Sequence, residues 1–255
     1  MHTISGGVGA PEPAHIPSPT TDSLSIPKIP DALMTALAGD YRSQHSFPWS
    51  RKPWMEKMHD LPEVLSLLVT MPDRIDRHHV AQTVSTELAA DRVMSGFIAA
   101  MVWGWGDAGG RGAVRTRWVL TGVNGRGEVV SALPVDPTVN GRLLQGAEAV
   151  REHGPVEGFR TMNNEARIKH LGPSYFTKWL YFTSADAGVE SRKTAPILDD
   201  RIIEWLAQNA GVQLDIGSTS AYTDYLRLLS AWGAEFGRTP VQVETEVFRL
   251  ATGRG

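Results

Sequence analysis

A short break between two helical stretches carries the residue types of an anion-binding site. In "HLGPSYF", Gly172 permits a sharp change of backbone direction, and Pro173 suits the first position of a following helix. The free N–H groups of such a helix start attract anions, and Arg167 and Lys169 add positive charge just before the break. A DNA phosphate is the anion that this arrangement favours, although any two packed helices need a turn. The segment predicts a helix-hairpin-helix unit over about 164–182.

Two acidic residues downstream begin another expected helix. The stretch "APILDDRIIEWL" places the carboxylate of Asp199 at the start of a helix over 198–210. The positive end of the helix dipole favours an ionised carboxylate, which suits a group that must be negative at neutral pH. An aspartate at this position can equally be a simple N-cap. Asp200 is the adjacent rival, and we interpret it as a first-turn partner of the helix dipole.

The elements that must position these side chains are helices. Apolar residues recur at helical spacing along most of the chain, which indicates about ten helices. The only strand-like segment, "GEVVSAL" (127–133), is too short and isolated to found a sheet. We therefore expect an all-α fold. The clearest helical stretches are 61–71, 80–103, 139–153, 155–162, 198–210, 221–237 and 240–251.

Composition sets the domain organisation and excludes several kinds of site. Residues 1–28 mix Gly, Pro, Ser and Thr without periodicity and predict a flexible tail before a helical domain over 29–255. Cysteine is absent, which excludes disulfides, thiolate zinc sites and cysteine-ligated iron–sulfur clusters. Adjacent His78 and His79 do not predict a metal site, because neighbouring helical side chains point about 100 degrees apart. The chain has no apolar run long enough to span a bilayer and no secretory signal, so we expect a cytoplasmic protein without membrane association.

The charge distribution is uneven. The net charge is -3, which argues against indiscriminate coating of nucleic acid. Residues 160–201 nevertheless contain seven Lys and Arg against five Asp and Glu, so this segment is net positive. A local excess of positive charge is the electrostatic feature that DNA binding requires.

The sequence around the hairpin resembles that of a known family. In "LGPSYFTKWLYF" followed by "ILDDRIIEWL", the chain is similar to the helix-hairpin-helix DNA glycosylases, and in particular to bacterial proteins with the 8-oxoguanine DNA glycosylase fold. The resemblance is most specific over 155–210 and looser over 84–125. It implies a two-lobed helical fold with the active site in the cleft between the lobes. It also implies that Asp199 stabilises the positive charge that develops on the sugar when the N-glycosidic bond breaks.

The resemblance leaves the nucleophile open. Glycosylases that also cut the strand have a lysine just after the hairpin, whereas this chain has Ser174 there, which favours a monofunctional enzyme that uses water. Lys178 lies one helical turn further on the same face. It could be the nucleophile, a wall of the base pocket or a phosphate ligand, or a solvent-exposed helix residue. Two departures from the family pattern are His170 in place of the first hairpin glycine and Phe176 in place of a small residue.

The remaining site residues follow from the same resemblance. DNA contacts are expected from the hairpin and from arginines after the Gly-rich turn "GWGDAGGRGAVRTR", and tryptophans are expected in the base pocket or as a wedge; a plain turn with core tryptophans is the alternative. The expected DNA-binding residues are Lys169, His170, Gly172, Ser174, Arg115 and Arg117, and the expected pocket residues are Trp105 and Trp179.

The implied partner is DNA, bound by a monomer. No cofactor is expected, and the one ion considered is a monovalent cation at the hairpin. The excised base stays open between oxidised guanine and a modified base of phage DNA. A DNA-binding module without catalysis and a helical interaction protein without nucleic acid are the competing hypotheses.

Overall fold

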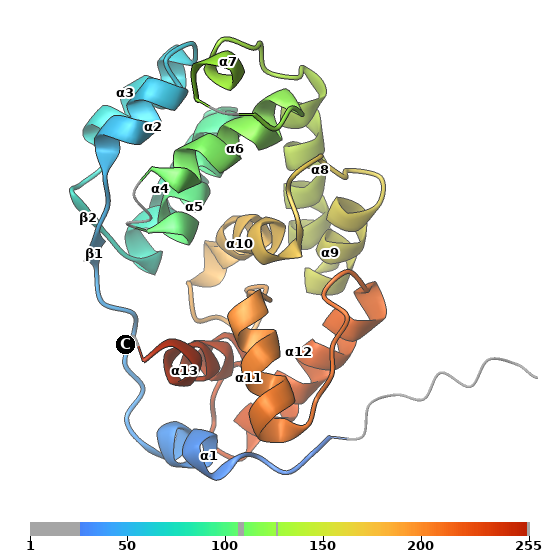
Figure 1. Ribbon diagram of the computed structural model, residues 1–255. Helices are drawn as coiled ribbons and strands as arrows, with labels where there is room; N and C mark the ends of the chain where they lie inside the picture. The colour runs from blue at the N-terminus through green and yellow to red at the C-terminus, as the bar shows by residue number, and fades with distance from the viewer. Residues whose placement is uncertain (1–25, 107–109, 126, 254–255) are drawn as a thin grey trace, which may run out of the picture.

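Helices form nearly all of the regular structure in the computed structural model, which describes residues 26–106, 110–125 and 127–253 (Figure 1). The predicted tail lies outside these residues up to position 25. The elements in chain order are α1 (Asp31–Ala38), β1 (Phe47–Pro48), α2 (Arg51–Lys57), α3 (Pro62–Thr70), β2 (Arg74–Ile75), α4 (Arg77–Ala89), α5 (Val93–Trp105), α6 (Arg111–Thr121), α7 (Gly127–Ser131), α8 (Thr138–His153), α9 (Pro155–Asn163), α10 (Pro173–Thr183), the 3₁₀ turn η1 (Ala185–Ala187), α11 (Asp200–Ala210), α12 (Thr219–Ala234) and α13 (Pro240–Thr252).

The all-α prediction is confirmed. The one strand-like segment of the sequence, which is too short and isolated to found a sheet, contains the short helix α7. Within it Val130 is buried and Val129 is exposed, so a single valine packs against the core while no neighbouring strand is available. The strands that form in the described residues are β1 and β2, two residues each, paired antiparallel with Phe47 opposite Ile75. No helix in the described residues is both long and apolar enough to cross a bilayer.

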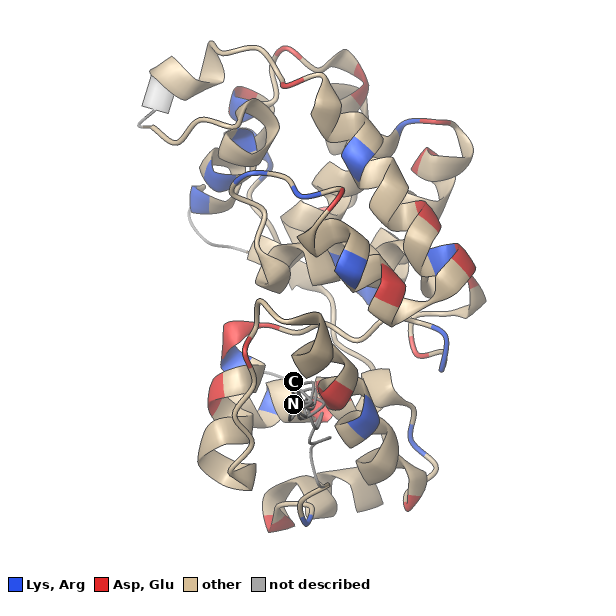
Figure 2. Ribbon diagram, turned by 90° about the vertical axis from the view of Figure 1, so that its right-hand side faces the viewer, with Lys and Arg blue, Asp and Glu red and all other residues tan. Residues whose placement is uncertain are grey.

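The helices divide into two lobes (Figure 2). Helices α2 to α10 form one lobe, in which α5 and α10 pack on each other and α8 packs on α9. Helices α11, α12 and α13 form the other lobe, and α1 joins it by packing on α13. An extended segment over 39–46 therefore runs from α1 in one lobe to β1 in the other (Figure 1). A continuous buried core connects both lobes.

Local signals in the sequence explain several helix boundaries. The single stretch predicted over 80–103 is two helices, because the chain turns at Asp91, which adopts a positive φ of 60°. Helix α13 begins with a capping box in which Thr239 and Gln242 exchange side-chain and backbone hydrogen bonds. Asp199 is the N-cap of α11, and its side chain accepts from two backbone N–H groups of the first turn.

The predicted hairpin region consists of a helix, a turn and a helix, but the helix end and the residue at the bend differ from the prediction. Helix α9 ends at Asn163, and residues 164–172 form a connector of turns instead of the predicted helical turn. Pro173 is the first residue of α10, as expected. Gly172 has an ordinary φ of −84°, so it does not supply the sharp bend. The left-handed residue is His170, with φ of 68°, a conformation that usually favours glycine.

Candidate active site

A cavity of about 1050 Å³ lies between the two lobes and has walls from three parts of the chain. The first wall is the extended segment and β1, residues 42–48. The second comes from the ends of α4 and α5 and from α10, and the third from α11 and α13. The predicted inter-lobe cleft is therefore present, and both Lys178 and Asp199 line it.

The two carboxylate oxygens of Asp199 have different partners. Its Oδ1 accepts from the backbone N–H groups of Arg201 and Ile202, at 3.1 and 3.2 Å, and so caps α11. Its Oδ2 lies 3.4 Å from the Nζ atom of Lys178. The cap role and the cavity role are thus compatible, because each uses a different oxygen. Asp200 is exposed and instead accepts from the Ser174 hydroxyl at 3.3 Å, outside the cavity lining.

Lys178 is a buried lysine with its amine in the cavity wall. The side chain is 9% exposed, and Nζ donates to the backbone oxygen of Ser174 at 2.5 Å. Burial lowers the pKa of the Lys178 amine below its usual 10.5, although the neighbouring Asp199 carboxylate acts in the opposite direction. The alternative of a solvent-exposed helix lysine is therefore excluded. A larger fraction of this amine is neutral near neutral pH than in an exposed lysine.

Aromatic side chains and a glycine hold the lysine in position. Trp105 lines the cavity and stacks on Tyr175, with ring centroids 4.6 Å apart. The Lys178 amine lies 5.1 Å from the centre of the Tyr175 ring. On the other side, a Cβ added at Gly104 would lie 2.8 Å from the Lys178 Cδ atom. The lysine therefore passes through a gap that only glycine leaves open.

Two predicted site residues belong to the core. Trp179 is completely buried, does not line the cavity, and donates its indole N–H to the Leu143 backbone oxygen at 3.0 Å. Arg117 is also buried, and its guanidinium makes a bidentate ion pair with Asp60 at 2.6 and 2.8 Å. It also donates to the backbone oxygens of Ser131, the last residue of α7, and of Leu133 just beyond it. The prediction that Trp179 lines the base pocket and that Arg117 contacts DNA is wrong, since neither side chain is accessible.

The other predicted DNA-binding residues lie on the surface. Lys169, His170 and Gly172 are exposed on the connector between α9 and α10. The rings of His170 and Trp118 make an edge contact, with their centroids 6.3 Å apart. The Arg115 guanidinium lies 4.5 Å from the centre of the same Trp118 ring. The arginines of α6, drawn as blue ribbon segments in Figure 2, differ in exposure: Arg111 and Arg115 are exposed, whereas Arg117 is buried. A role of the exposed residues in binding DNA stays a prediction.

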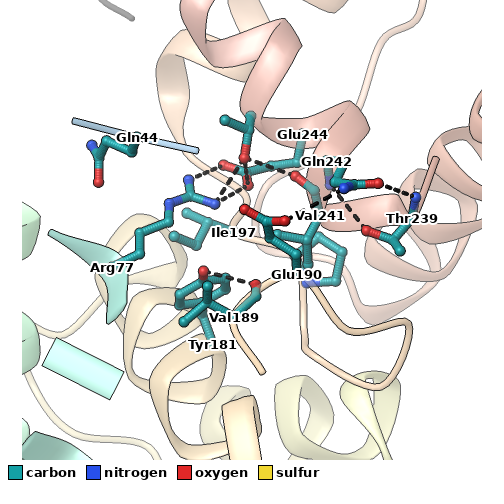
Figure 3. A network of polar contacts seen from close by, with 12 residues as sticks. Gln44, Arg77, Tyr181, Val189, Glu190, Ile197, Thr239, Val241, Gln242 and Glu244 are labelled. Carbon is teal, nitrogen blue, oxygen red and sulfur yellow. Dashed lines mark hydrogen bonds and ion pairs between the residues drawn. The ribbon is translucent and has the colours of Figure 1, made fainter. Parts of the chain in front are cut away.

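Sequence reasoning missed a polar network at the inner end of the cavity. Arg77 at the start of α4 forms a buried ion pair with Glu244 of α13, at 3.1 and 3.2 Å (Figure 3). Gln44 of the extended segment lines the same cavity, as does Trp103. No local pattern marks these residues, because the two partners of the ion pair are 167 positions apart in the chain.

The all-α fold with an active-site cleft between two lobes is the fold class of the helical DNA glycosylases. The chain belongs to the family described as "Putative 8-oxoguanine DNA glycosylase OGG-like protein", whose match covers residues 40–248. Comparison with curated proteins and with solved structures gave no match.

Proposed function

We propose that the protein is a DNA glycosylase that cleaves the N-glycosidic bond of a base flipped into the inter-lobe cavity. The observation that carries this proposal is the distance of 3.4 Å between Lys178 Nζ and Asp199 Oδ2, both in the wall of the cavity between the two lobes. Membership of the glycosylase family supports it. Exposed basic residues outside the cavity lining, including Arg115 and Lys169, would bind the phosphates of the duplex.

Asp199 has the chemistry that glycosidic cleavage needs. As the base leaves with the bonding electrons, positive charge builds on the sugar, and a fixed carboxylate nearby stabilises that charge. Capping of α11 through Oδ1 holds the carboxylate in place, so Oδ2 requires no reorganisation to face the sugar.

Lys178 supplies an amine nucleophile in this proposal. A neutral amine attacks the anomeric carbon, and the base departs with the bonding electrons and takes up one amine proton. Transfer of the second amine proton to the ring oxygen opens the sugar as the carbon–oxygen bond breaks and leaves a Schiff base. The lowered pKa and the burial of Lys178 support this route. Ser174, at the position where strand-cutting relatives have lysine, supports the alternative of water as the nucleophile. Borohydride, which reduces a Schiff base to a stable link, distinguishes the two.

The experiment uses duplexes that carry 8-oxoguanine, other oxidised bases or modified cytosines, followed by alkali to reveal abasic sites. We expect Asp199→Asn to lower excision by roughly 10²-fold or more, because it removes the charge that stabilises the transition state. Asparagine caps helices as well as aspartate, so the fold of α11 is preserved. Asp200→Asn, one position away and outside the cavity, is the matched control and should stay near the wild-type rate.

The nucleophile is tested on the same substrates. Lys178→Ala should abolish borohydride trapping, while the exposed Lys193→Ala should trap like the wild type. Excision without trapping would assign the attack to water. Binding of the duplex with no excision of any base would support the non-catalytic DNA-binding module and refute the glycosylase proposal.

A further inference from the structure

The inner wall of the cavity contains a glutamine whose orientation is fixed. Gln44 lies on the extended segment between α1 and β1, and its Oε1 accepts from the indole N–H of Trp103 at 2.9 Å. The Trp103 ring is itself held by stacking on Tyr181, at 6.4 Å and an interplanar angle of 12°, and by an edge contact with Phe182 at 5.1 Å. The partner of the glutamine is therefore an immobile donor.

This contact determines which end of the amide is left for a ligand. An indole N–H can only donate, so the oxygen of the Gln44 amide must face Trp103. The amide nitrogen then points away from the indole with its two N–H donors. Gln44 is half-buried and lines the cavity, which makes these donors part of the cavity wall.

Arg77 is a second polar side chain of the cavity lining that packs on the same indole, and its Nε atom is buried from solvent. Arg77 packs its guanidinium over the rings of Trp103 and Tyr181, at 5.4 and 4.9 Å from their centres. Both terminal nitrogens bind Glu244 (Figure 3), whereas the Nε–H has no partner among the described residues. The Arg77 side chain is 6% exposed and lines the cavity. A buried donor without an acceptor is uncommon in folded proteins.

We propose that Gln44 is the specificity-determining residue of the cavity. Its amide N–H groups, oriented by Trp103 and close to Arg77, donate to a carbonyl oxygen on the edge of the flipped base that faces away from the sugar. The proposal rests on the proposed glycosylase function. The wall offers N–H donors, so a complementary base must offer an acceptor.

The donor pattern separates two groups of bases. Guanine-type bases present a carbonyl oxygen at position 6, and uracil-type bases present one at position 4, so both can accept from Gln44. Adenine- and cytosine-type bases present an amino group at the corresponding position, which would place N–H against N–H. Such a mismatch leaves buried donors unpaired and disfavours the amino-bearing base.

Gln44 is the residue to change, because Arg77 is part of a buried ion pair between the lobes and its loss would endanger the fold. Gln44→Glu keeps the size and the acceptor for Trp103 but replaces the amide nitrogen with an acceptor. Gln44→Leu removes both polar ends. Gln208→Glu, an exposed change of the same chemistry on α11, is the matched control.

Excision rates are measured on duplexes with 8-oxoguanine, uracil or hypoxanthine, and on duplexes with mispaired adenine or modified cytosines. Binding to a duplex with a tetrahydrofuran abasic analogue, which has no base, serves as the reference. We expect the wild type to prefer the carbonyl-bearing bases. Both Gln44 variants should lower their excision by about 10-fold, with abasic-analogue binding changed less than about 2-fold, and Gln208→Glu should match the wild type.

Three results would overturn the assignment of Gln44. They are equal losses of excision and abasic-analogue binding in Gln44→Leu, wild-type-like preference in Gln44→Glu, and a wild type that excises amino-bearing bases as fast as carbonyl-bearing ones. A wild type that excises no base would instead refute the glycosylase function on which the assignment depends.

Discussion

The gap at Gly104 allows a test of whether the position of the Lys178 amine matters for activity. Gly104 is close to the end of α5, and a Cβ built on it would lie 2.8 Å from Lys178 Cδ and 3.5 Å from Cε. Ordinary contacts of this kind begin at 3.4 Å, so Gly104→Ala requires a displacement of about 0.6 Å. The atom that must move belongs to a flexible side chain and not to the backbone.

Gly104→Ala should lower activity and leave stability nearly unchanged. Misplacement of a catalytic group by about 1 Å can cost 10²-fold in rate, so a shift near 0.6 Å should lower Schiff-base trapping by roughly 10-fold or more. Alanine is a better helix former than glycine, by about 0.5–1 kcal/mol in a helix interior, and Gly104 is near a helix end. The free energy of unfolding should therefore change by less than about 0.5 kcal/mol, with no fall in Tm beyond about 2 °C.

Borohydride trapping rates and thermal unfolding of Gly104→Ala and the wild type provide the assay. Gly141→Ala, at a helical glycine of α8 where an added Cβ meets nothing within 4 Å, is the matched control and should trap normally. Wild-type trapping in Gly104→Ala would refute the reasoning, because the amine would then tolerate the displacement. A fall in Tm of many degrees would show that the backbone had moved instead of the lysine.

Two further predictions concern charge. Arg117→Met should lower the free energy of unfolding by roughly 2 kcal/mol in denaturant titrations, because it removes the buried guanidinium with its ion pair to the partly exposed Asp60 and its hydrogen bonds to two backbone oxygens. Arg115→Ala should leave stability within about 0.5 kcal/mol and weaken DNA binding with a smaller salt dependence, and equal stability of the two variants would contradict this. Because burial lowers the pKa of Lys178, its amine is protonated and unreactive at low pH and becomes neutral as pH rises, so the trapping rate should increase with pH with a midpoint below 10.5. A flat profile, or a midpoint above 10.5, would contradict a lowered pKa.

Local patterns in the sequence were enough to predict the elements that carry the site. Helical spacing and helix-end residues identify α8, α11 and α13, and place Asp199 at a helix start and Pro173 at the first position of α10. The segment over 127–133 is strand-like in sequence but helical in the structure, because two adjacent valines suit either a strand or a short helix and only the neighbouring chain decides between them. Left-handed His170 could not be read from its residue type, since a glycine two positions later was the obvious candidate for the bend.

Roles that depend on tertiary contacts were harder to predict. Arginine is usually exposed, so nothing in the sequence indicated that Arg117 would be buried against Asp60 while Arg115, two positions earlier, stays on the surface. Trp179 and Lys178 are adjacent in the chain, yet they face the core and the cavity respectively, because neighbours on a helix point in different directions. Gln44 and its partner Trp103 are 59 positions apart in the chain, so no local pattern indicates their hydrogen bond.

The packing of α1 on α13 has a consequence for the order in which the molecule can be completed. During synthesis α1 emerges early, but the surface on which it packs is made by α13, a helix that emerges more than 200 residues later. Nascent chains halted before α13 should therefore lack one wall of the cavity, however well the first lobe has already folded.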